Sequence, residues 1–420
     1  MTIKITPLDA WARKKTDDLG VWQLECLRET IRWARNSPFY RERLPGGLPE
    51  SLTDLRGLPL MDGGDLRREG LRLLCAPPGE IVRIVSLRTS GTTDNPKRVC
   101  FTSDDQELTA DFFADGLTTV TPPGGVMAIM LPLGSSGGVA DLICRGLSRI
   151  PARPVPFGML ESFNDAALTL KREGVRSLVG VPSQALALAR YLRHIRKRAV
   201  EPESVLLTAD YIPEAIVNEL AGFGIRVYKH YGMTEMGFGC AIDCDAHSGQ
   251  HIRETDLLLE VIEPETCAAL PDGEWGEVVF TTLTRRGMPL IRYRTGDISR
   301  LLPGGCPCGG GLRRLDDVKG RSNEGIMLGG GVLTMPDMDE AIFALPQVMD
   351  FSAEAEEGAL RISVATFAGM AALRKEAVSD ALDALPAIAN TKNLRISAEI
   401  IPMEEYPRMY NGKRRITRKI

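Results

Sequence analysis

The sequence contains no apolar run long enough to span a membrane, and its first residues lack the apolar core of a signal peptide. It also lacks an excess of charge of either sign, because 51 Lys and Arg residues are balanced by 55 Asp and Glu residues. A surface that attracts nucleic acid or an anionic membrane is therefore not expected. These absences predict a cytoplasmic protein with neither a membrane nor a nucleic acid as its partner.

Two familiar motifs are also missing. Nine cysteines, an odd number scattered over 420 residues, do not form the disulfide framework that is typical of small secreted domains. The spacing G-x-x-x-x-G-K-[ST] is absent, which excludes a Walker A phosphate-binding loop. A nucleotide site, if there is one, has to be built from another motif.

The chain is too long for one hydrophobic core, so two or more domains are expected. Short apolar runs at 124–133 and 175–182 alternate with helical patterns at 161–174 and 183–199. This alternation predicts an α/β fold in which helices cover β-sheets. Strands and turns are predicted across 251–301, including a hairpin around a Pro-Asp-Gly turn.

Glycines and polar residues cluster in KGRSNEG (319–325), where we place a domain boundary. The chain then divides into a large domain, residues 1–320, and a second domain, residues 321–420. The first is predicted to consist of β-sheets layered with helices. The second is predicted to be a small α+β domain.

The segment SLRTSGTTDNPKRVCFT (86–102) follows an apolar run that is typical of a strand. Small residues let backbone N–H groups approach an anion, hydroxyl groups donate further hydrogen bonds, and a lysine adds positive charge. The candidate phosphate ligands are Thr89, Ser90, Gly91, Thr92, Thr93 and Lys97. A simple Ser/Thr-rich turn is the alternative that this loop, taken alone, leaves open.

Three further motifs follow the loop in order: YGMTE (231–235), YRTGD (293–297) and NGKRR (411–415). Together with the loop, they resemble the adenylate-forming superfamily of acyl-CoA synthetases. SPFYRERL (37–44) and CPCGGGLRRLDDVKGRS (306–322) are similar to segments of the phenylacetate–CoA ligase branch. So is GEVVFTTLTRRGMPLIRYRTGDIS (276–299). The resemblance thus covers nearly the whole chain.

The resemblance implies an ATP-dependent carboxylic acid–CoA ligase. Such an enzyme joins a small carboxylic acid to ATP as an acyl-adenylate, releases pyrophosphate, and then forms an acyl-CoA thioester with release of AMP. Because an anionic nucleophile attacks a polyanion, the site must neutralise negative charge. The resemblance also implies Mg²⁺ as a cofactor, a homodimer, and mobility of residues 321–420, which carry the catalytic lysine.

The first motif supplies four site residues by resemblance. Tyr231 would lie against the adenine ring, with Gly232 beside it in the nucleotide site. Thr234 would hydrogen-bond the α-phosphate. Glu235 would hold Mg²⁺, a cation that prefers carboxylate and phosphate oxygens.

The later motifs supply the rest by resemblance. Asp297 would accept hydrogen bonds from both ribose hydroxyls, and Arg321 would reach the ribose or the phosphates. Lys413 would bridge the carboxylate and the α-phosphate, although a solvated basic tail is the alternative at that position. Two residues depart from the family pattern: Asp94, where the family usually has glycine, and Asn323 at the hinge.

A group of cysteines and histidines offers metal ligands. Cys306 and Cys308 lie in a Gly/Pro loop, and Cys244 is followed by His247 and His251. Three thiolates and an imidazole suit a tetrahedral structural Zn²⁺ site. By resemblance the ligands are Cys244, His251, Cys306 and Cys308. His247 is the competing ligand, and free cytosolic thiols are the alternative.

The sequence defines less well which carboxylic acid is the substrate and which molecule accepts the acyl group. Segment 131–143 stands where aryl-CoA ligases line the acyl pocket, yet it holds no aromatic residue. Asp210 is either a polar wall of that pocket or a helix-capping acid. The basic helix end that begins at Arg190 suggests either a phosphate contact for CoA or a solvated face. Transfer to an acceptor other than CoA, and a catalytically decayed nucleotide-binding protein, are the alternative functions.

Overall fold

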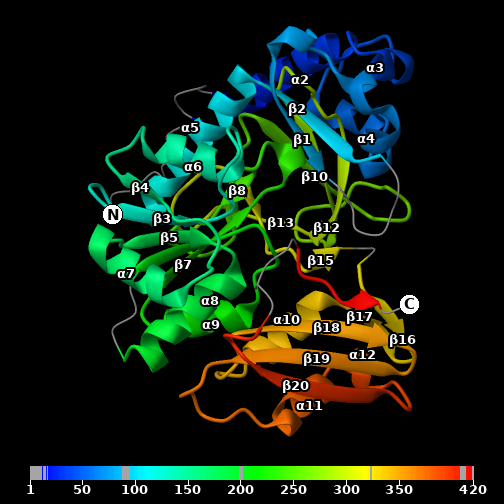
Figure 1. The fold of residues 1–420 in the computed structure, drawn as a ribbon. Coiled ribbons are helices and arrows are strands. Elements are labelled where there is room, and N and C mark those ends of the chain that lie inside the picture. The colour runs from blue at the N-terminus through cyan, green and yellow to red at the C-terminus, as the bar shows by residue number, and fades with distance from the viewer. Residues whose placement is uncertain are drawn as a thin grey trace. The chain divides into compact units, whose positions relative to one another are not determined.

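The computed structural model describes residues 12, 16, 18–87, 95–197, 202–321, 324–406 and 413–418 (Figure 1). Its internal contacts group the chain into two compact units. Unit 1 consists of Met1–Pro123, Gly134–Pro151 and His230–Ser322, and unit 2 of Gly124–Leu133, Ala152–Lys229 and Asn323–Ile420. The predicted boundary after residue 320 thus lies next to a unit boundary. The division into a large domain and a mobile 321–420 domain stays a prediction.

The helices of unit 1 begin at residues that cap them. Asp18 accepts the N–H of Val21 at the start of α2 (Leu19–Ala34), and Thr102 and Asp105 form a capping box for α5 (Ser103–Val120). The other helices of this unit are α3 (Pro38–Arg43), α4 (Gly63–Glu69) and α6 (Val139–Leu147). Short 3₁₀ turns occupy Leu52–Gly57, Gly70–Leu73, Pro78–Glu80 and Thr234–Met236, the last named η5.

The strands of unit 1 are antiparallel. β1 (Ile81–Leu87) pairs with β2 (Lys97–Thr102), so the candidate phosphate loop joins two strands of a hairpin. A four-stranded sheet has the order β10-β11-β12-β15, with bounds Leu257–Ile262, Gly276–Thr282, Tyr293–Ser299 and Gly320–Arg321. The predicted hairpin is confirmed by the pairing of β10 with β11. A second group comprises β8 (Ala241–Ile242), β9 (Gln250–Ile252), β13 (Leu301–Leu302) and β14 (Arg314–Leu315).

The core of unit 1 joins its N-terminal helices to the four-stranded sheet. Leu27 and Ile31 of α2 belong to the same buried cluster as Phe280 of β11 and Tyr293 of β12. Their spacing of four residues places both side chains on one face of α2. This core supports β12, the strand that carries the YRTGD motif.

Unit 2 contains a parallel sheet of the order β4-β3-β5-β6-β7 (Figure 1). The bounds are β3 (Val126–Met130), β4 (Arg153–Pro156), β5 (Ser177–Gly180), β6 (Ser204–Leu207) and β7 (Arg226–Tyr231), whose last two residues belong to unit 1. The crossover helices are α7 (Phe163–Glu173), α8 (Pro182–Arg190), continued by a π-helical turn at Tyr191–Ile195, and α9 (Glu214–Gly222). α7 ends at Gly174, the last residue of the helical pattern predicted at 161–174, and the φ of this glycine is +64°.

The rest of unit 2 is an α+β arrangement. A hairpin of β16 (Ile326–Leu328) and β17 (Gly331–Leu333) precedes α10 (Met335–Phe343). A sheet of the order β20-β19-β18-β21 follows, with bounds Arg395–Pro402, Ala359–Thr366, Asp350–Glu356 and Thr417–Arg418. Helices α11 (Lys375–Asp383) and α12 (Pro386–Ala389) accompany it, and α10 contacts α9.

The predicted alternation of strands and helices is therefore observed from β3 to β7, and the predicted α/β class is confirmed. Within the described part of the chain, every helix is too short or too polar to cross a lipid bilayer.

Candidate active site

A buried ion pair joins β2 to η5. The Lys97 ammonium lies 2.5 Å from Oε1 of Glu235, and the Tyr293 hydroxyl donates to the same oxygen at 3.2 Å. The Arg285 guanidinium donates to the backbone carbonyl of Glu235 at 2.5 Å. The Glu235 side chain is 2% exposed and that of Lys97 is 17% exposed, so water screens this pair weakly.

The charges of this group follow from its surroundings. Burial by itself raises the pKa of the Glu235 carboxyl, but the charge and hydrogen bond of Lys97 and the Tyr293 hydroxyl outweigh it, so the pKa lies below its ordinary value. Burial lowers the pKa of Arg285 to about 10, which leaves the guanidinium charged at neutral pH. Glu235 is thus an ionised carboxylate, the oxygen ligand that a hard divalent cation prefers.

A second group centres on Asp297 of β12. Its Oδ2 accepts the Tyr231 hydroxyl at 2.8 Å, and its Oδ1 accepts Nε of Arg321 at 2.8 Å. Strand pairing explains the second contact, since β12 and β15 place Asp297 directly opposite Arg321. The structure therefore brings three of the predicted nucleotide ligands into one hydrogen-bonded set.

The two groups are neighbours along β12. Tyr293 and Asp297 are four residues apart on this strand, and Arg321, which is bound to Asp297, is close enough to act on the Tyr293 hydroxyl. Burial and the charge of Glu235 raise the pKa of the Tyr293 hydroxyl, and the positive charge of Arg321 opposes them. Charged residues of both groups thus act on the Tyr293 hydroxyl.

The turn between the motif residues requires glycine at position 232. A Cβ atom there would lie 2.4 Å from the carbonyl oxygen of Phe238, well inside contact distance. Phe238 itself has a φ of +69°, an uncommon conformation for an aromatic residue. Thr234 opens η5, and its carbonyl accepts the N–H of Gly237 at 2.9 Å. The YGMTE segment is therefore a tightly folded turn after β7.

The remaining predicted site residues are not part of the hydrogen-bonded groups described above. The loop residues Thr89, Ser90, Gly91, Thr92 and Thr93, with Asp94 and Asn323, lie outside the described residues. Lys413 is described, belongs to unit 2, and is exposed.

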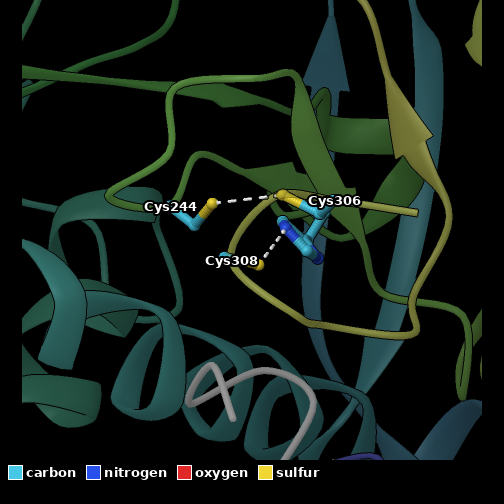
Figure 2. Close-up of side chains that lie close together, drawn as sticks. Cys244, Cys306 and Cys308 are labelled. Atoms are coloured by element: carbon cyan, nitrogen blue, oxygen red, sulfur yellow. Dashed lines mark hydrogen bonds between the residues drawn. The ribbon is translucent and has the colours of Figure 1, made fainter. Parts of the chain in front are cut away.

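The predicted metal ligands form a compact cluster. One donor atom from each of Cys244, His251, Cys306 and Cys308 lies within 4.8 Å of every other. Sγ of Cys244 is 3.7 Å from Sγ of Cys306, and Sγ of Cys308 is 3.4 Å from Nε2 of His251. Figure 2 shows the three labelled cysteine side chains converging on one point. Burial raises the pKa of both the Cys244 and the Cys308 thiols.

The competing histidine is not part of this cluster. Nδ1 of His247 lies 2.9 Å from Oδ2 of Asp243, and its side chain is 44% exposed. His251 lies in β9 and is fully buried. The structure therefore groups His251, and not His247, with the three thiols.

The basic helix end is solvated in part: Arg193 and Lys197 are exposed. Arg190, its first residue, fits neither interpretation. Its side chain is fully buried, and Nε donates to Oε1 of Glu219 at 2.8 Å. The guanidinium also donates to the carbonyls of Phe343, at 2.7 Å, and Val348. It is an internal ion pair of unit 2, so it neither meets CoA nor lies on a solvated face.

Asp210 does not cap a helix. The first N–H groups of α9, those of Glu214 and Ala215, are bound by the Glu340 carboxylate at 2.8 and 3.0 Å. Asp210 instead accepts the backbone N–H of Arg414 at 3.3 Å. The helix-capping interpretation is wrong, and the role of Asp210 as a pocket wall stays a prediction.

Comparison with known proteins identifies the family. A family model described as AMP-binding enzyme matches residues 85–283. The phenylacetate-coenzyme A ligase of Thermus thermophilus is 30% identical over 357 residues, which cover 79% of this chain and 77% of the relative. The chain belongs to the AMP-binding enzymes, in the phenylacetate–CoA ligase-like branch. The ligase of the same name from Aromatoleum evansii is 31% identical over 363 residues, covering 81% of this chain and 79% of the relative.

A solved structure supports the fold assignment. The 2-hydroxyisobutyryl-CoA ligase, in a postadenylation state with R3-HIB-AMP, matches with a TM-score of 0.78 over 94% of this chain and 88% of that chain. Only 20% of the aligned residues are identical, so the likeness concerns the fold. This match confirms the predicted fold class, and the sequence relatives confirm the predicted family.

Two residues of the site were not assigned from the sequence. Tyr293 and Arg285 contact Glu235 through its carboxylate and its carbonyl. Both lie in the segment that carries the family resemblance, so a signal was present. Glu235 is 58 positions away from Tyr293, and the fold, which brings β12 next to η5, creates the contact.

Proposed function

We propose that this chain is an ATP-dependent carboxylic acid–CoA ligase that forms an acyl-adenylate with release of pyrophosphate and then an acyl-CoA with release of AMP. The observation that carries the proposal is the buried set in which Lys97 meets Glu235 and Tyr231 and Arg321 meet Asp297. Its residues match the family motifs one by one. Membership in the AMP-forming acid–CoA ligases supports the same reaction.

Asp297 is proposed to hold the ribose. Each carboxylate oxygen now accepts one hydrogen bond, from Tyr231 or Arg321, and has lone-pair capacity for another. Two ribose hydroxyls suit that remaining capacity. Tyr231 and Gly232 would border the adenine. Arg321, anchored on Asp297, would direct its positive charge to the ribose or the phosphates.

Glu235 is proposed to hold Mg²⁺ beside the phosphates. Its buried, ionised carboxylate fits the donor type that Mg²⁺ prefers, and Lys97 is its counter-ion in the free protein. When bound, the metal would neutralise phosphate charge and orient the nucleotide. Lys97 would turn from Glu235 toward the phosphates, joined by Thr234 and by the hydroxyl groups of Thr89, Ser90, Thr92 and Thr93 around Gly91.

Lys413 is proposed to act in the first step. Its ammonium, a mobile point charge on a flexible side chain, would contact the acid carboxylate and the α-phosphate, between which negative charge accumulates. This contact is stronger in the transition state than in the ground state, so it lowers the barrier to adenylation.

The cysteine cluster is proposed to bind a structural Zn²⁺. Tetrahedral zinc, with bonds of about 2.3 Å to sulfur and about 2.0 Å to nitrogen, places two sulfurs about 3.8 Å apart and a sulfur about 3.5 Å from a nitrogen. The observed 3.7 Å and 3.4 Å match these separations. The four residues would fill all four coordination positions of the zinc, as protein ligands do in structural zinc sites. A cytoplasmic location and a homodimer complete the proposal.

The test is a panel of carboxylic acids with ATP and Mg²⁺: phenylacetate, anthranilate and 2-hydroxyisobutyrate. Pyrophosphate release reports adenylation, and AMP with acyl-CoA after addition of CoA reports ligation. Lys413→Ala should lower pyrophosphate release by about 100-fold or more, with ATP affinity changed less than about threefold, because it removes charge stabilisation from the transition state.

The matched control is Lys392→Ala, an exposed lysine of the same unit, which should retain full activity. Unchanged turnover in Lys413→Ala would remove the lysine assignment. Pyrophosphate release that CoA never converts to acyl-CoA would point instead to a different acceptor.

A further inference from the structure

Arg414, the residue that follows Lys413, makes hydrogen bonds or ion pairs with four residues of unit 2. Nε of Arg414 lies 2.9 Å from Oδ1 of Asp339, and its Nη1 lies 2.5 Å from Oδ1 of Asp350. Its Nη2 donates to the carbonyl of Phe351 at 3.0 Å, and its backbone N–H donates to Oδ2 of Asp210 at 3.3 Å. One residue thus joins the segment after β6, helix α10, and the start of β18.

This environment is specific for arginine. The guanidinium lies over the rings of Phe343 and Phe351, with centroid distances of 5.0 and 4.4 Å. The Asp339 and Asp350 side chains are 3% and 2% exposed, and that of Arg414 is 10% exposed. A planar group with several donors satisfies two carboxylates and a carbonyl at once, which a lysine ammonium cannot do in the same geometry.

The arrangement bears directly on Lys413. Asp210 binds the N–H of the peptide that links Lys413 to Arg414, and burial raises its pKa while the charges of Arg414 and Lys413 lower it. On the far side, β21 pairs with β18, Thr417 lying opposite Glu354. The backbone after Lys413 is therefore fixed at two points, although the Lys413 side chain is exposed.

We infer that Arg414 and Asp210 are positioning residues for Lys413, fixing the backbone from which the lysine reaches the reacting groups. The inference rests on the proposed adenylation. A lysine side chain has four rotatable bonds, so a fixed Cα is what confines its ammonium to the volume where charge develops. Asp210, in the segment after β6, ties the backbone next to the lysine to that segment.

The test separates the two half-reactions. Arg414→Met should lower kcat for pyrophosphate release by about tenfold or more, with KM for ATP changed less than about twofold. Thioester formation from a chemically prepared acyl-adenylate and CoA should keep its rate. In a Lys413→Ala background, Arg414→Met should cause little further loss, since both changes remove one function. Arg415→Met, at the neighbouring exposed arginine, is the control and should be near wild type.

A conservative substitution at Asp210 tests whether its acceptor oxygen is what matters. Asp210→Asn keeps an acceptor oxygen for the Arg414 N–H and should retain most activity, whereas Asp210→Ala should lose about tenfold in kcat for adenylation. Equal losses in both half-reactions, or losses that add to that of Lys413→Ala, would show a merely structural role and overturn the inference.

Hydrogen exchange gives a readout that needs no acid substrate. The amides of residues 413–418 should exchange about tenfold faster in Arg414→Met and Asp210→Ala than in wild type or Arg415→Met. Unchanged exchange in correctly folded variants overturns the inference. If Lys413→Ala releases pyrophosphate normally, the proposed role of the lysine fails. If Lys413→Ala is impaired but Arg414→Met releases pyrophosphate normally, the proposed positioning role of Arg414 fails.

Discussion

The charge state of Glu235 depends on a single lysine. Burial opposes ionisation of this carboxyl, and Lys97, at 2.5 Å, reverses that effect. We predict that Lys97→Met lowers the free energy of unfolding by about 3–5 kcal/mol, because it leaves a buried carboxylate without its partner. The double variant Lys97→Met/Glu235→Gln should be less destabilised than the two single changes predict together. Urea unfolding measures both quantities.

Lys392→Met, an exposed change in unit 2, serves as the control and should change stability by less than about 0.5 kcal/mol. Strict additivity of Lys97→Met and Glu235→Gln would contradict a direct interaction between the two residues. ATP binding should weaken in the Lys97 variant, since the same ammonium is proposed to meet the phosphates.

The motifs located Tyr231, Glu235, Asp297 and Arg321, because short segments with fixed spacing can be matched to a family. They did not reveal that Lys97 pairs with Glu235, which lies 138 positions away. Such a contact is created by the packing of η5 against the start of β2. Spacing along the chain carries no information about it.

At the scale of elements, the cysteine cluster joins β9, which contains His251, to the loop between β13 and β14, which contains Cys306 and Cys308. Spacing alone offered both His247 and His251, since both follow Cys244 closely, and the family resemblance favoured His251. The backbone decides between them: His247 lies in a turn with φ of +44° and contacts Asp243, whereas His251 is inside a strand. Spacing alone could thus predict this group of candidate ligands but not choose between the two histidines; the resemblance to the family made that choice, and the structure groups the same four residues.

We predict that freshly purified protein contains about one zinc per chain and that His247→Ala keeps it. His251→Ala and Cys306→Ser should lose it, and with it several kcal/mol of stability, because metal binding is coupled to the fold of these strands. Elemental analysis and thermal unfolding of the same samples give both values. Absence of zinc from untreated wild-type protein, or its loss from His247→Ala, would contradict the assignment.

At the scale of the molecule, hydrophobic alternation was sufficient to predict an α/β class, because periodicity reports which residues are buried. It could not predict that unit 1 takes its residues from three separate stretches of the chain. Strand order depends on packing between segments distant in sequence, such as β9 beside β14 and β3 beside β5. The small α+β segment was predicted, but not the buried contacts of Arg190 and Arg414 within unit 2.

The two units should respond to pH in opposite senses. Burial raises the pKa of Asp339 in unit 2 to about 7, with Arg414 opposing it, so between about pH 4 and 7 the folded state holds a proton that the unfolded state releases. Unit 2 is therefore destabilised as pH rises through this range. Burial lowers the pKa of His230 in unit 1 to about 4, so the unfolded state gains a proton first on acidification. Unit 1 is destabilised as pH falls from about 6.5 to 4.

Two variants test these opposite slopes. Relative to wild type, Asp339→Asn should become more stable as pH rises from about 4 to 7, and His230→Gln should become more stable as pH falls from about 6.5 to 4. Each slope is at most about 1.4 kcal/mol per pH unit. The tryptophans that the structure describes, Trp22, Trp33 and Trp275, belong to unit 1. Tryptophan fluorescence therefore reports the unfolding of unit 1, where His230 acts. Circular dichroism reports the unfolding of both units and so also detects the effect of Asp339 in unit 2. Parallel slopes in the two variants would contradict the assignment, because a raised and a lowered pKa cannot act on stability in the same direction.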